Sequence, residues 1–172
     1  MREAGNYSEG RYSTNTYIFN TKLKEIKKFC EEHIKIYVKE IINPKEKLDF
    51  YITQSWLTHI KPREGFQRHF HSNSIISGAF YISVGEDDKI RFFDSMAYQK
   101  GKYKFETLEY NLWNSTNWSF DANNNMLMLF PSWLEHDVKL NENTTTDRIS
   151  IAFNVFARGI FGVSDATDVL IL

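Results

Sequence analysis

Apolar and polar residues alternate with two different periods along the chain, and the change of period separates a helical part from a β part. Between residues 20 and 44, apolar side chains recur every three or four positions, which predicts one amphipathic helix. Asn20 or Thr21 is expected to cap its start, and Pro44 to end it. The predicted apolar stripe comprises Leu23, Ile26, Cys30, Ile34, Tyr37 and Ile41.

After Pro44 the period falls to two, which is typical of β-strands. Short runs separated by turn sequences such as GEDD and NENTTTD predict about eight strands between residues 50 and 157. Residues 95–125 are the least regular part, with short strand-like runs between Asn-rich loops. A helix followed by short strands favours a mainly β fold, a double-stranded β-helix (jelly roll), with one long N-terminal helix packed on a sheet.

Length and composition narrow the class of protein. The 172 residues suit a single domain over 1–172, with an irregular polar arm at 1–16 and a C-terminal tail at 159–172. The net charge of −1 offers no basic surface, so no nucleic-acid partner is expected. No signal peptide and no apolar run of membrane-spanning length are visible, and a cytoplasmic protein without a membrane partner is expected. The lone Cys30 forms no disulfide within one chain.

Two histidines, His69 and His71, stand one residue apart at the head of a predicted strand. Residues two apart on a strand share a face, so both imidazoles can converge on one metal ion, although the pair alone also suits a merely polar strand face. His136, from a later strand, supplies the third ligand that a site built on a sheet requires. Asp94 is an alternative ligand, whereas the carboxylates flanking His136 point to the opposite face.

The predicted last strand, RISIAFN at 148–154, has two unlike faces. One face is apolar and should meet the core or the helix. The other carries Arg148, Ser150, Ala152 and Asn154. An arginine on an otherwise small and polar face indicates a site for a carboxylate, to which Ser150 can donate a second hydrogen bond. A surface arginine at a strand start is the alternative interpretation.

The order H-x-H, distant histidine, arginine resembles that of the Fe(II)- and 2-oxoglutarate-dependent oxygenases. More narrowly, HFHSNSIISGAFYIS, LFPSWLEHDVKLN and RISIAFN resemble a family of short 2-oxoglutarate/Fe(II) oxygenases of bacteria and their phages, over about residues 15 to 158. The resemblance implies the jelly-roll fold, Fe(II), O2 and the cosubstrate 2-oxoglutarate. In the broader superfamily a carboxylate stands where this chain has His71, so either a three-histidine iron site or a carboxylate such as Asp94 is implied.

The same resemblance implies an enzyme that hydroxylates an unidentified small molecule or peptide, with release of succinate and CO2, in the cytoplasm of a bacterium or a phage-infected cell. The implied metal ligands are His69, His71 and His136, with no catalytic residue beyond the metal centre. The residues expected to bind the cosubstrate are Arg148 and Ser150, with Tyr81, Asn73 and Asn154 as further polar candidates on the predicted strands.

Two other interpretations remain open. A cupin-type three-histidine dioxygenase would not use 2-oxoglutarate and would need neither Arg148 nor Ser150. A non-catalytic jelly-roll binding protein could hold a structural ion, but such zinc sites usually close with four protein ligands, whereas the sequence offers three. The apolar tail is expected to pack on the core or on a second copy in a homodimer.

Overall fold

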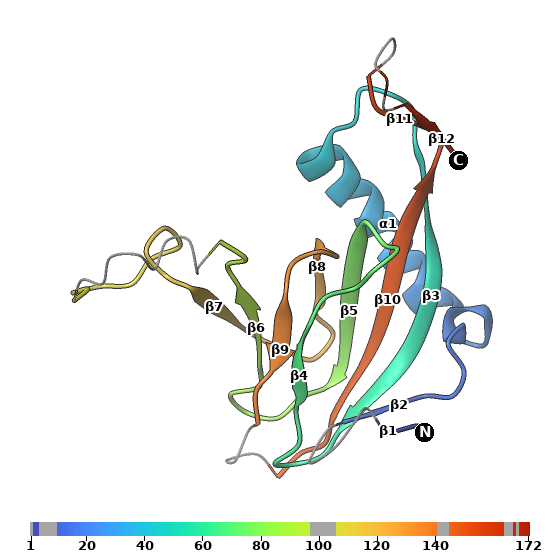
Figure 1. Cartoon of the computed structure of the whole chain (residues 1–172). Helices are drawn as coiled ribbons and strands as arrows, with labels where there is room; N and C mark the ends of the chain where they lie inside the picture. The colour runs from blue at the N-terminus through green and yellow to red at the C-terminus, as the bar shows by residue number, and fades with distance from the viewer. Residues whose placement is uncertain (1, 4–9, 97–105, 141–144, 164–166, 168) are drawn as a thin grey trace.

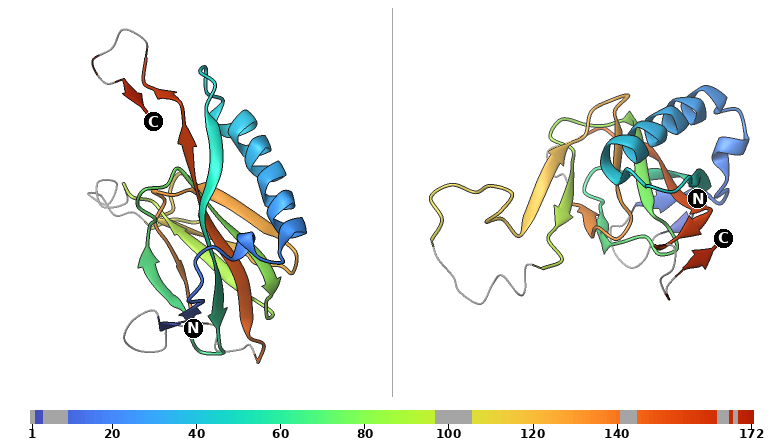
Figure 2. Two further views of the ribbon diagram at one scale, coloured as in Figure 1. Left: turned by 90° about the vertical axis from the view of Figure 1, so that its right-hand side faces the viewer. Right: turned by 90° about the horizontal axis from the view of Figure 1, so that it is seen from above.

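A computed structural model describes residues 2–3, 10–96, 106–140, 145–163, 167 and 169–172. Two antiparallel sheets lie face to face, and a helix covers the outer face of the larger one (Figures 1 and 2). The larger sheet has the order β1 (Arg2–Glu3), β2 (Arg11–Tyr12), β3 (Asp49–Ile60), β10 (Arg148–Arg158), β5 (Ile76–Ser83), β8 (Leu127–Pro131). The smaller sheet has the order β4 (Phe66–His69), β9 (His136–Val138), β6 (Lys89–Phe93), β7 (Asn117–Asp121). This arrangement confirms the mainly β, jelly-roll prediction.

The predicted N-terminal helix is α1 (Lys24–Tyr37), which continues into one π-helical turn, η2 (Val38–Ile42). Asn43 then adopts a left-handed conformation with φ 44°, directly before Pro44, as the sequence predicts for the helix end. The predicted cap is wrong. A short 3₁₀ turn, η1 (Ile18–Asn20), precedes the helix, and the Thr21 hydroxyl donates back to the carbonyl of Ile18 instead of capping α1. Leu23 occupies the N-cap position without a side-chain hydrogen bond.

The two faces of β10 separate the core from the cavity between the sheets. Ile151, Phe153 and Val155 are fully buried and pack in one cluster with Cys30 and Ile34 of α1. The alternate residues of β10 line the space between the two sheets. The alternation read from the sequence is therefore confirmed, and it directs every polar side chain of RISIAFN away from the helix.

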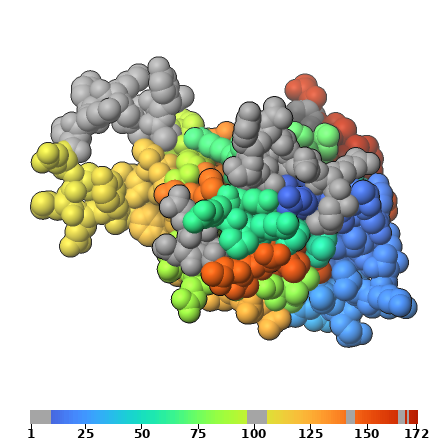
Figure 3. Space-filling view, turned by 90° about the horizontal axis from the view of Figure 1, so that it is seen from below, coloured from blue at the N-terminus to red at the C-terminus, as the bar shows by residue number. Residues whose placement is uncertain are grey.

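A second, smaller core lies between the sheets, where Ile90 and Phe92 of β6 pack on Phe130 of β8. Beyond it, residues 106–116 extend away from the body of the molecule before β7 begins (yellow in Figures 1 and 3). Within the expected irregular region 95–125, β7 is the one long strand among the described residues, and 97–105 lie outside them.

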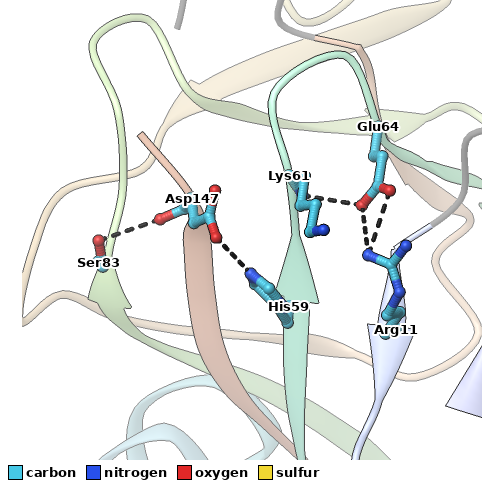
Figure 4. A network of polar contacts seen from close by, with 6 residues as sticks. All are labelled: Arg11, His59, Lys61, Glu64, Ser83 and Asp147. Carbon is cyan, nitrogen blue, oxygen red and sulfur yellow. Dashed lines mark hydrogen bonds and ion pairs between the residues drawn. The ribbon is translucent and has the colours of Figure 1, made fainter. Parts of the chain in front are cut away.

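The segment expected to be an irregular arm contributes two short strands, since β1 pairs with β2, and β2 with β3. Polar contacts fix this end of the larger sheet: Arg11 pairs with Glu64 at 3.2 Å, and His59 meets Asp147 at 2.6 Å (Figure 4). The C-terminal tail forms a small hairpin of β11 (Ile160–Phe161) and β12 (Leu170–Ile171). None of the helices in the described part of the chain has the length and apolar character needed to span a lipid bilayer.

Candidate metal centre

Strand pairing brings two of the predicted ligands together. His69 on β4 and His136 on β9 are directly opposed across the smaller sheet, and their ring centroids lie 4.4 Å apart. His71 lies just beyond β4, which ends at His69, so the pair lies at the end of a strand and not at the head of one as the sequence predicted. The backbone N–H of His71 donates to the Ser132 carbonyl at 2.9 Å, which holds the chain in place there. One ring nitrogen from each of the three residues lies within 4.8 Å of the other two.

Hydrogen bonds assign which nitrogen of each imidazole is available. Nδ1 of His69 lies 2.6 Å from the Gln67 carbonyl, and Nδ1 of His136 lies 2.9 Å from the Leu134 carbonyl. Nδ1 of His71 lies 2.6 Å from the side-chain oxygen of Asn154. Because these oxygens only accept, each Nδ1 carries the proton, and each Nε2 keeps a lone pair for a metal ion.

The surroundings of His71 and His136 favour the neutral imidazole, the form that binds metal. His136 is buried against Phe130, with ring centroids 4.7 Å apart, and desolvation lowers the pKa of His136 to about 3. Desolvation also lowers the pKa of His71, although its hydrogen bond to Asn154 opposes the shift. Three imidazole donors suit a divalent ion such as Fe(II), Zn(II), Ni(II) or Cu(II). The residues present therefore fit a transition-metal ion.

The alternative ligand Asp94 is not part of this cluster. In the described part of the chain, the group contains the three histidines and no carboxylate. Asp94 instead lines a second, apolar cavity of about 540 Å³ between β6, β7 and β8, where its carboxylate accepts the Met96 N–H. Phe130 lines both cavities and forms part of the wall between them.

The histidines line one part of a cavity of about 400 Å³ between the sheets, and Arg148 lines another. Arg148 is buried, with 4% of its surface exposed, and it forms no ion pair with a carboxylate of the described residues. Its Nη1 donates to the Lys89 carbonyl at 3.0 Å, while its Nε has no partner among those residues. A buried guanidinium with an unused donor fits an anionic ligand, because an unsatisfied buried donor costs about 1–3 kcal/mol.

Tyr81 and Ser150 lie beside Arg148, as the sequence suggested. The guanidinium carbon is 5.0 Å from the centroid of the Tyr81 ring, and the Tyr81 hydroxyl has no hydrogen-bond partner in the described structure. Burial raises the pKa of Tyr81, and the charge and N–H groups of the neighbouring Arg148 oppose this rise, so the phenol keeps its proton and can donate it to a ligand. Ser150 Oγ lies 2.6 Å from Oγ1 of Thr58, a cavity residue that the sequence reading missed.

The two asparagines that the sequence placed near the cosubstrate, Asn73 and Asn154, lie in different surroundings. Asn154 lines the cavity, but its side-chain oxygen is engaged by His71 and by Ser77 at 3.0 Å. Asn73 is exposed and lies outside the cavity lining, so its placement beside a ligand is wrong. The reason is local: Asn73 has φ 55°, a left-handed turn, so the strand period that runs through His69 no longer applies.

Comparison with known proteins supports the assignment of the fold and the family. A model of the family described as "Putative 2OG-Fe(II) oxygenase" matches residues 54–154, which include all three histidines and Arg148. Three solved structures superpose with moderate TM-scores. The non-heme alpha ketoglutarate dependent epimerase SnoN has a TM-score of 0.62 and 8% identity over 96% of this chain. A Trichoplax adhaerens prolyl hydroxylase in complex with a peptide fragment has a TM-score of 0.57 and 10% identity over 88% of this chain. Streptomyces hygroscopicus HygX with nickel and 2-oxoglutarate bound has a TM-score of 0.54 and 11% identity over 82% of this chain.

At these identities the structures are similar in fold alone. This chain spans 71%, 65% and 70% of the lengths of those three proteins, and 56% of a Burkholderia pseudomallei oxidoreductase of the 2OG-Fe(II) oxygenase family. A search of the curated proteins gave no significant match.

Proposed function

The chain belongs to the 2OG-Fe(II) oxygenase family, and from this we propose that it is a non-haem Fe(II)- and 2-oxoglutarate-dependent oxygenase that hydroxylates a small molecule or peptide. The observation that carries the proposal is the content of one cavity. It combines a cluster of three imidazoles with a buried arginine that forms no carboxylate pair in the described structure. A structural ion alone would not require the arginine.

In this proposal, Nε2 of His69, His71 and His136 holds Fe(II). Three protein ligands leave positions of the ion open to small molecules, as in catalytic sites, whereas a structural zinc site usually closes with four. The three donors carry no charge, so the metal retains more positive charge than it would beside a carboxylate. This favours binding of anionic chelators over neutral ones.

Arg148, Tyr81 and Ser150 receive the carboxylate of 2-oxoglutarate that lies away from the metal. Arg148 supplies the compensating charge, and the Tyr81 hydroxyl supplies a neutral donor. Between them and the histidines, Ala152 of β10 and Ala79 of β5 are cross-strand partners that line the cavity. Their small side chains leave room for a chain of carbon atoms between the two ends.

When bound, Fe(II), 2-oxoglutarate and O2 supply oxidative decarboxylation of the cosubstrate to succinate and CO2, coupled to hydroxylation of the substrate. The protein supplies placement and a low-dielectric cavity. Ile60, Phe66, Ile90 and Val138 line it with apolar surface, which strengthens the attraction between Arg148 and an anion by excluding water.

The test is anaerobic titration with Fe(II) and 2-oxoglutarate, followed by the weak visible charge-transfer absorption of the chelate. Arg148→Gln should weaken 2-oxoglutarate binding by at least about 30-fold, because a buried charged hydrogen bond is lost. Arg158→Gln is the matched control, since Arg158 lies at the exposed, opposite end of the same strand, and it should bind like wild type.

Two outcomes would contradict the proposal. If wild type binds Fe(II) but shows no absorption change with 2-oxoglutarate, a cupin-type reaction without this cosubstrate is favoured. If wild type binds no divalent ion, both catalytic interpretations fail. If wild type binds both Fe(II) and 2-oxoglutarate, release of succinate in the presence of candidate small molecules and peptides would identify the substrate class.

A further inference from the structure

The three histidines are oriented by two different kinds of acceptor. His69 and His136 each place Nδ1 against the carbonyl two residues earlier in the chain, at Gln67 and Leu134. These backbone acceptors persist whatever the side chains are. His71 instead depends on the side chain of Asn154, which lies 83 residues away on β10 of the other sheet. The orientation of His71 is therefore the one that a side-chain substitution can remove.

The pairing of β3 with β10 is irregular beside Asn154, because β3 has one extra residue, Thr53, at this point. The register between β10 and β3 shifts between Asn154 and Val155, so Asn154 is opposite Gln54 while Val155 is opposite Ile52. Such a β-bulge, here in β3, is common beside functional sites, while β10 keeps a regular register with β5 through Asn154. The Thr53 hydroxyl donates to the Asn154 carbonyl at 3.2 Å across the shifted register.

Buried hydroxyls extend in a row from the Asn154 amide. Ser77 Oγ donates to the Asn154 side-chain oxygen at 3.0 Å and lies 2.8 Å from Ser132 Oγ. Ser132 in turn donates to Ser74 at 2.8 Å. Ser77 and Ser132 are fully buried. The Asn154 side-chain oxygen thus lies between His71 Nδ1 and Ser77 Oγ, and both groups can donate to it.

We propose that Asn154 is a positioning residue of the metal centre, which holds His71 as the Nδ1–H tautomer with Nε2 directed at the ion. This inference rests on the proposed metal-binding function and deepens it. The segment RISIAFN then has two roles, since Arg148 binds an anion and Asn154 orients a metal ligand. Without Asn154, His71 is free to rotate or to adopt the Nε2–H tautomer, which has no lone pair on Nε2 for the ion.

The first experiment measures Co(II) affinity from the d–d absorption of the bound ion, which requires no substrate and no turnover. Asn154→Ala should weaken Co(II) binding by roughly 10- to 100-fold and alter the spectrum, the range found when outer-shell partners of ligands are removed. Asn154→Asp keeps an acceptor oxygen and should restore affinity to within about threefold of wild type. Gln54→Ala, which alters the cross-strand neighbour of Asn154, should bind Co(II) like wild type.

The second experiment reads the tautomer directly, by ¹⁵N NMR of the histidine rings in the metal-free wild-type protein. The proposal requires His71 as the Nδ1–H form, and Ser77→Ala should introduce a share of the other tautomer. If wild-type His71 is Nε2–H, or if Asn154→Ala binds Co(II) with unchanged affinity and spectrum, the role of Asn154 is refuted. Absence of Co(II) binding in wild type would instead refute the metal site itself, so the two failures are distinct.

Discussion

Gly78 of β5 has no side chain, which leaves room for a core residue of β10 to pack directly over it. It is the cross-strand partner of Phe153, and a Cβ at this position would overlap the Phe153 ring. Gly78→Ala should therefore reduce the free energy of unfolding by about 1–3 kcal/mol through overpacking, measured by urea denaturation. The same substitution in a Phe153→Leu background should cost clearly less, because the smaller side chain relieves the overlap. An equal cost in both backgrounds would contradict this explanation.

At this scale the sequence predicts which residues come together better than it predicts their individual contacts. His69 and His136 come together because β4 and β9 pair at these two residues, and His71 joins them from the segment that follows β4. Asn73 was placed wrongly because a left-handed turn interrupts the period. The contact between Asn154 and His71 could not be predicted, since it depends on how the two sheets pack against each other.

At the scale of elements, alternation in RISIAFN predicted both faces of β10, because a strand between a helix and a cavity must be apolar on one side and adaptable on the other. The start of α1 was not predictable from capping residues, since the η1 turn uses Thr21 for its own hydrogen bond. Pairing of β2 with β3 was also missed, because a two-residue strand is too short to show a period.

The packing of α1 on the sheet predicts a dependence of stability on alkaline pH. Burial of Cys30 raises the pKa of its thiol to about 12, against 9.0 for an exposed thiol. Between these values the unfolded chain releases a proton that the folded protein keeps, so the stabilisation is complete below pH 9 and declines as the pH rises. Wild type should lose about 1.4 kcal/mol more than Cys30→Ala on going from pH 8 to pH 10. Equal losses, measured by urea denaturation, would show that the thiol ionises freely in the folded protein.

At the scale of the whole molecule, the proposed metal ion ties the two sheets together. Its ligands come from β4, β9 and the segment after β4, and the Asn154 contact joins His71 to β10 in the larger sheet. An ion that binds only the folded protein stabilises it by about 2.7 kcal/mol at a free concentration 100 times its dissociation constant. For a chain of this length, this should raise the Tm by roughly 5–10 °C.

This linkage can be measured by thermal unfolding with Co(II) or Zn(II), and then with a chelator in excess. The metal-dependent rise in Tm should disappear in His71→Ala, because two imidazoles from one sheet no longer enclose the ion. It should persist in His33→Ala, since His33 lies on α1, away from the cluster. The rise should also shrink as the pH falls far enough to protonate the ligands, because metal and protons compete for the same nitrogen atoms. A rise in Tm that His71→Ala leaves intact would place the ion elsewhere on the protein, and the arginine-lined cavity would then lack the metal that its proposed chemistry requires.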